Sequence, residues 1–133
     1  MQVQQILSQP ARVLTQGQRE KYFADGFVCV EDIVPNDTLT ELQRVTAEFQ
    51  DKSRAETTSG DTFDVRSGHC AETPILRRLK SPDIQDDAYW SFSTGLMADI
   101  AADLLGPNVV FHHSKLNFGT VRQKELETER AVS

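Results

Sequence analysis

Three histidines, His69, His112 and His113, are the residues of this chain most suited to binding a metal ion. A non-haem iron site needs two histidines and a carboxylate on one face of the metal, with open positions for substrate and oxygen. A strand supplies such ligands economically as His-x-Asp, because residues i and i+2 point the same way. The chain contains no His-x-Asp or His-x-Glu, and the adjacent His112 and His113 would face opposite sides of a strand. We therefore assign neither metal ligands nor catalytic residues.

Other kinds of catalytic site find no better support. His69 and Glu72, at i and i+3, could meet only on a helix, and the nearby Gly68 and Pro74 argue against one. The chain contains no Gly-x-Ser-x-Gly elbow and no Gly-rich phosphate loop. The residues alone thus predict an α+β protein without a complete active site.

One segment, NVVFHHSKLNF at residues 108–118, is predicted to be a strand with polar side chains. On a pleated strand His113, Lys115 and Asn117 share a face with Val109 and Phe111. That face changes from apolar to polar along its length, so it could run from a core into a cavity. The alternative is an exposed face whose polar side chains lie in water.

The elements that would position this strand are mostly helical. Amphipathic spacing predicts helices over residues 15–25, 38–54 and 86–105. Thr15 with Gln18, and Thr38 with Glu41, have the spacing of capping boxes. Gly26 and Gly106 fit the ends of the first and third helices.

Two further short segments have the composition of strands. FVCV, residues 27–30, is predicted to be a strand with Cys29 in the core, and TFDVR is a weaker strand candidate. In LRRLK, Arg77, Arg78 and Lys80 are interpreted as a solvated face rather than an anion site.

Composition limits the classes of partner. The formal net charge of −6 argues against nucleic acid or an anionic membrane as the main partner. No run of about 18 apolar residues predicts a membrane span. The N-terminus lacks the basic and long apolar regions of a signal peptide, so we expect a cytoplasmic protein with reduced cysteines.

The ordered combination QREKYFADGFVCVEDIV and LLGPNVVFHHSKLNF resembles the N-terminal part of the phytanoyl-CoA dioxygenase family. The resemblance covers residues 14–118. It implies the N-terminal helices and first strands of a double-stranded β-helix, or jelly roll, in an oxygenase that uses Fe(II) and 2-oxoglutarate. It also implies that His113, Lys115 and Asn117 line a substrate or cosubstrate cavity.

The sequence departs from the family pattern at Gly119, where the family has a lysine that helps to hold 2-oxoglutarate. The family's His-x-Asp, distal histidine and 2-oxoglutarate-binding arginine have no counterpart. We therefore expect a flexible N-terminus at 1–13, a family-like region at 14–118 and a polar, disordered tail at 119–133, in a fold truncated before its barrel is complete.

This interpretation predicts the function of the chain, and two alternatives remain open. The parent activity is hydroxylation of a small organic substrate, and this chain alone should be inactive and bind neither Fe(II) nor 2-oxoglutarate. One alternative is a non-catalytic module that binds a homologue or another protein through uncovered sheet edges. Another is an enzyme assembled by oligomerisation, with His69 or His113 donated across an interface.

Overall fold

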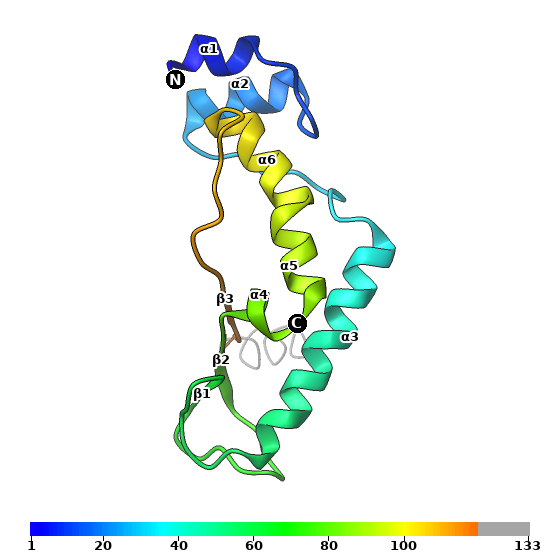
Figure 1. Ribbon diagram of the computed structural model, residues 1–133, viewed down its shortest axis with the longest axis vertical. Coiled ribbons are helices and arrows are strands. Elements are labelled where there is room, and N and C mark those ends of the chain that lie inside the picture. Colours follow the sequence, from blue (N-terminus) through cyan, green and yellow to red (C-terminus); the bar gives the residue numbers. More distant parts are fainter. Residues whose placement is uncertain (120–133) are drawn as a thin grey trace, which may run out of the picture.

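The computed structural model describes residues 1–119 and shows an elongated α+β arrangement (Figure 1). Helices α1 and α2 lie at one end, a small sheet lies at the other, and α5 and α6 connect them. The expected polar tail lies outside the described residues, except for Gly119. In chain order the elements are α1 (Val3–Ser8), α2 (Gln16–Asp25), α3 (Asn36–Lys52), the 3-10 turn η1 (Ser53–Ala55), β1 (Phe63–Val65), β2 (Leu76–Lys80), α4 (Pro82–Gln85), α5 (Asp87–Thr94), α6 (Leu96–Leu105) and β3 (Lys115–Asn117).

The sheet has three antiparallel strands in the order β1-β2-β3. Leu79 at its centre pairs with Phe63 on one side and Leu116 on the other. Opposed residues of paired strands point to the same face, so these three apolar side chains form one row. A bulge between Asp64 and Val65 shifts the register. Neither a complete jelly roll nor a truncated one is established by this arrangement.

The main core forms where the helices cover this apolar face. Val45 and Phe49 of α3 and Tyr89 of α5 pack with Phe63 and Leu79 in one buried cluster. Val45 and Leu79 are fully buried. The hydrophobic face predicted for the second helix therefore forms, although Leu39 at its first turn is 42% exposed.

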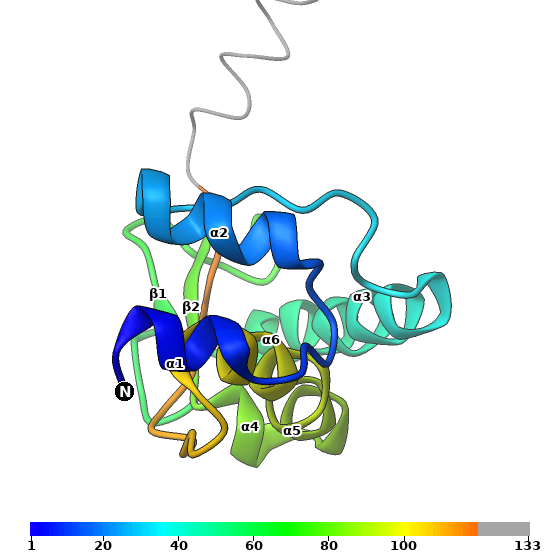
Figure 2. The ribbon, with the colours of Figure 1, turned by 90° about the horizontal axis from the view of Figure 1, so that it is seen from above.

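The N-terminal segment 1–13, which we expect to be flexible, contains helix α1. Helix α1 lies alongside α2 and contacts α6 (Figure 2), and Ile6 is buried. The buried Arg19 of α2 and Asp103 of α6 join these elements through hydrogen bonds. At the α1–α2 end of the molecule, the side chains of Arg19 and Asp103 thus satisfy several backbone groups and take the place of a larger apolar core.

The capping box predicted at the start of α2 is present. Thr15 and Gln18 form both bonds of a capping box, and Gly26 ends α2 with φ 83° in the left-handed region. Asp86 caps α5 through the N–H of Ala88. The capping box predicted at Thr38 is wrong, because α3 begins two residues earlier, after Pro35.

The predicted helix over 86–105 is divided at Gly95 into α5 and α6. Gly95 has φ −95° and ψ −100°, outside the helical region. A Cβ at this position would lie 2.8 Å from the Ser91 carbonyl oxygen. That distance is too short for a Cβ and a backbone oxygen, so a larger residue would force the backbone to shift. Gly95 therefore permits the close turn between α5 and α6, which follow each other along one line.

One strand prediction was wrong and another was wrong in extent. Residues 27–30 form no strand, Phe27 is 61% exposed and Cys29 is exposed rather than in the core. Of the strand predicted over 108–118, only Lys115–Asn117 pairs with a neighbour. LRRLK forms the central strand instead. Among residues 1–119, no helix has the length and apolar character needed to cross a membrane.

Candidate functional site

The open face of the sheet carries two of the three residues predicted to line a cavity. Leu116 and Phe118 pack toward the core, whereas Lys115 and Asn117 are exposed on the opposite face. This alternation agrees with the pleat expected from the sequence. His113 is also exposed, but it lies in the irregular segment before β3. The structure therefore brings Lys115 and Asn117 together and places His113 outside the sheet.

Charged side chains from all three strands share this open face. Asp64, Arg78 and Asn117 are paired in register across the sheet, and Lys80 pairs with Lys115. The Asp64 carboxylate lies 3.1 Å from Lys80 Nζ and 3.5 Å from Arg78 Nε. Arg78 and Lys80, interpreted from sequence as a solvated face, are thus partly buried around one acid.

A cavity of about 340 Å³ lies at the β2–β3 side of this face. The Nε atoms of Arg66 and Arg78 are buried and form no hydrogen bond within the described part of the chain. Arg66 follows β1, where its backbone N–H donates to the Ile75 carbonyl at 2.9 Å. The described lining consists of Arg66, Arg77, Arg78, Asn117, Phe118 and Gly119.

His69 has a structural role that occupies both of its ring nitrogens. Its Nδ1 accepts the backbone N–H of Ile75 at 2.8 Å, and its Nε2 lies 2.7 Å from the Ser53 carbonyl oxygen. An acceptor Nδ1 leaves the proton on Nε2, which then donates to Ser53. The ring joins the end of α3 to the loop before β2. His69 therefore has no lone pair free for a metal, either within the chain or across an interface.

His112 and His113 do not form an iron site with their neighbours. Their ring centroids are 4.5 Å apart in an edge-to-face arrangement, and both residues are exposed. Across residues 1–119, no three His, Cys, Asp or Glu side chains are grouped closely enough to hold a metal ion. The described residues thus do not fit a two-histidine, one-carboxylate iron site.

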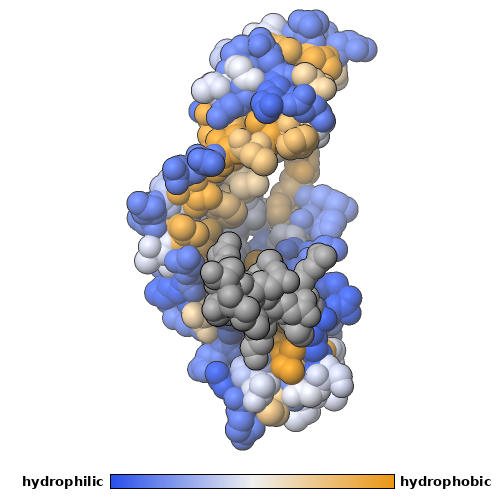
Figure 3. Space-filling view, turned by 180° about the vertical axis from the view of Figure 1, so that it is seen from behind, coloured by the Kyte–Doolittle hydropathy of each residue, from blue (hydrophilic) through white to orange (hydrophobic). Residues whose placement is uncertain are grey.

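A second, more apolar groove of about 490 Å³ lies between the α5–α6 column and residues 109–114. Figure 3 shows hydrophobic surface gathered along this side of the helices. Val110 is 91% exposed and Met97 is 43% exposed. His112 and His113 form part of the groove wall. Their surroundings are thus a hydrophobic surface with two imidazoles at its edge.

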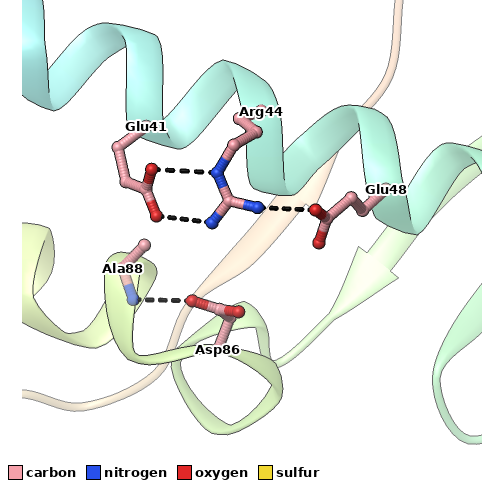
Figure 4. Close-up of polar contacts among 5 residues, drawn as sticks. All are labelled: Glu41, Arg44, Glu48, Asp86 and Ala88. Atoms are coloured by element: carbon pink, nitrogen blue, oxygen red, sulfur yellow. Dashed lines mark hydrogen bonds and ion pairs between the residues drawn. The ribbon is translucent and has the colours of Figure 1, made fainter.

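An exposed ion cluster on α3 borders a third cavity. Arg44 donates to Glu41 at 2.6 Å and to Glu48 at 2.5 Å, close to the Asp86 cap of α5 (Figure 4). The hydrogen bond and charge of Glu41, followed by the charge of Glu48, raise the pKa of Arg44. The hydrogen bond from Arg44 lowers the pKa of Glu41. Glu41, Arg44 and Glu48 are three and four residues apart, so they lie on one face of α3, and their ion pairs stabilise the helix.

Comparison with known proteins yields no relatives. No protein-family model, no curated protein and no solved structure matches this chain.

Proposed function

We propose that the chain corresponds to the N-terminal part of a phytanoyl-CoA dioxygenase-like protein. The parent activity is hydroxylation of a small organic substrate, with Fe(II) and 2-oxoglutarate supplying the oxidising chemistry. The two faces of β3 carry the proposal. Leu116 and Phe118 pack under the helices, while Lys115 and Asn117 face outward from the sheet.

This division of faces supports a sheet that is one wall of a cavity. In a double-stranded β-helix two sheets face each other across an interior, and helices cover an outer face. Here α3 and α5 cover one face of the β1-β2-β3 sheet, and the other is polar. Strands added beside β3 and opposite this face would enclose Lys115 and Asn117.

The chain by itself should not turn over 2-oxoglutarate. His69 is bonded through both ring nitrogens, and among residues 1–119 neither His112 nor His113 belongs to a group of three side chains that could hold a metal ion. We expect no succinate from the purified 133-residue chain with Fe(II), 2-oxoglutarate and oxygen. Turnover by this chain would overturn the proposal of inactivity.

The DNA downstream of the Phe118 codon tests the family proposal directly. We expect another frame or exon to encode a strand with His-x-Asp and a later histidine. A protein carrying that sequence in place of residues 119–133 should produce succinate from 2-oxoglutarate. Downstream DNA without His-x-Asp in any frame would contradict the proposal.

A second candidate is a non-catalytic module that binds a full-length homologue. It is favoured by the sheet edges, because β1 and β3 each pair only with β2 among the described strands. Unpaired strand edges and exposed apolar side chains such as Val110 promote association. Co-purification with a full-length family member would support this function. A monomer with a sharp, cooperative melt and no affinity for the homologue would oppose it.

A further inference from the structure

We propose that the cavity beside β3 binds the carboxylate or phosphate group of a small anionic ligand. The proposal concerns Arg66, Arg78 and Asn117, and it needs neither iron nor an oxygenase reaction. It therefore stands or falls separately from the family proposal.

The first argument is unsatisfied hydrogen bonding. The Nε atoms of Arg66 and Arg78 are buried without a hydrogen-bond partner among residues 1–119. A buried donor without an acceptor is costly, and charged donors cost most. Both arginines line the same cavity. An oxygen anion placed there would give Arg66 Nε the acceptor that the described protein atoms do not provide, and it would give Arg78 Nε a closer acceptor than the Asp64 carboxylate at 3.5 Å.

The second argument is charge. The described lining of the cavity has three arginines and no acidic residue. The carboxylate nearest to Arg78 is Asp64, which lies closer to Lys80 Nζ, at 3.1 Å, than to Arg78 Nε, at 3.5 Å. One shared carboxylate therefore leaves an excess of positive charge on this part of the sheet. The excess favours an anion over a neutral or cationic ligand.

The third argument is geometry and size. A guanidinium presents planar pairs of N–H donors that match carboxylate and phosphate oxygens. Asn117 adds an amide at the same wall, and it pairs in register with Arg78 across β2 and β3. A cavity of about 340 Å³ is at the small end of ligand-binding sites. The site thus fits a small anion or the anionic end of a larger molecule.

The acidic cavity near α3 shows that this charge pattern is local. That cavity is lined by four acidic residues, Asp37, Glu41, Asp86 and Asp87. The chain as a whole carries a net charge of −6. An anion attracted by overall charge alone would have no reason to approach this protein. Binding at the arginine-lined cavity would therefore report local recognition.

Nuclear magnetic resonance titration of the full chain can test the site. Inorganic phosphate and malonate serve as tetrahedral and planar probes, with sodium chloride keeping ionic strength constant because salt screens charge. We expect the Nε–H signals of Arg66 and Arg78 to shift saturably with at least one probe. The Arg44 Nε–H signal should not, because Arg44 is already bonded to Glu41 and Glu48. The stronger probe identifies which group is preferred.

Substitutions provide the matched control. Arg66→Gln should weaken binding by about tenfold or more, since it removes a charged donor. Arg44→Gln removes the same charge from α3 and should bind as the wild type does. Arg78→Gln also disturbs the contact with Asp64, so its fold is checked by the dispersion of its amide signals. If it does not fold, Arg66→Gln and Asn117→Ala carry the test.

Three results would overturn the proposal. The first is the absence of a saturable shift with either probe. The second is an Arg66→Gln variant that binds both probes as tightly as the wild type. The third is equal weakening by Arg66→Gln and Arg44→Gln, which would indicate attraction by net charge rather than a site.

Discussion

Arg19 and Asp103 form a buried connection between α2 and α6, with Arg19 Nε donating to the Asp103 carbonyl oxygen at 2.8 Å. Asp103 also accepts the consecutive backbone N–H groups of residues 12–14, at 2.8 to 2.9 Å. Arg19 Nη1 donates to the Gln9 carbonyl at 3.0 Å, and Nη2 donates to the Ile6 carbonyl. The turn between α1 and α2 is thus held by two charged side chains that satisfy its backbone groups.

Replacing Asp103 with Asn should strongly destabilise the protein. Asn has one acceptor oxygen in place of two, so at least one of the three N–H groups loses its partner. The charge facing Arg19 is lost as well. We expect the free energy of unfolding to fall by about 3 kcal/mol, measured by urea denaturation at pH 7.

Asp99→Asn is the matched control for this substitution. Asp99 lies on the same helix and contacts Arg12 at 3.1 Å, but its side chain is 45% exposed. Exposed ion pairs contribute little, so its loss should change the free energy of unfolding by less than about 1 kcal/mol. Equal effects of the two variants would show that Asp103 has no special structural role.

Stability should fall in acid through Asp103. Burial, the largest single influence, raises its pKa, but the N–H groups of Leu14, Arg12 and Val13 and the charge of Arg19 together lower it. A lowered pKa in the folded state stabilises the protein above the unfolded value of about 4. That contribution disappears as the pH falls through the folded value.

Denaturation of the wild type and Asp103→Asn at pH 7, 5 and 3 would measure this dependence. We expect the difference between the two proteins to be constant above about pH 5 and to shrink toward pH 3. A difference that persists unchanged at pH 3 would mean that the ionised carboxylate is not what stabilises the turn.

Local chemistry made much of the helical structure predictable. Thr15, Gln18 and Gly26 act through neighbours within a few residues, so the sequence states their roles directly. The break at Gly95 was less visible, because a glycine inside a helical pattern is often tolerated. Its effect depends on a backbone conformation that the apolar periodicity on either side does not reveal.

Strands were harder to predict because they need partners. Residues 27–30 have strand-like composition but no neighbour to pair with, and Phe27 is exposed. Residues 76–80 appear charged, yet Leu76 and Leu79 both reach the core because the register shifts beside them. A spacing of three does not match the period of two expected for a strand.

The candidate site was predictable only in part for the same reason. Alternation along one strand correctly paired Lys115 with Asn117. Arg66 and Arg78 come from different segments, and only the sheet pairing places them beside Asn117. The sequence signal was the basic run at 77–80, whose alternative interpretation was an anion site.

Leu79→Ala should test the centre of the sheet. Leu79 is fully buried and pairs with both Phe63 and Leu116. Removing its side chain leaves a cavity between three strands and α3, which should cost about 2 to 5 kcal/mol. Ile84→Ala is the control, because Ile84 is 79% exposed and its truncation should be nearly neutral. Similar melting temperatures for the two variants would contradict the packing described here.

His69 should accept a hydrogen bond at Nδ1 and carry a proton on Nε2. Nitrogen-15 spectra of the ring should show Nδ1 as an acceptor and Nε2 as protonated, because Ile75 donates to the first and Ser53 accepts from the second. Cobalt(II) should leave these signals in place and act first on the exposed His112 or His113.

A His69→Phe variant keeps a planar aromatic ring but removes both hydrogen bonds. We expect it to lose about 1 to 3 kcal/mol of unfolding free energy, since the Ile75 N–H and the Ser53 carbonyl lose their partner. The Phe ring is larger than imidazole, so the substitution leaves no cavity. If cobalt(II) instead perturbed His69 before the other histidines, or if His69→Phe were as stable as the wild type, then the ring would not be bonded through both nitrogens.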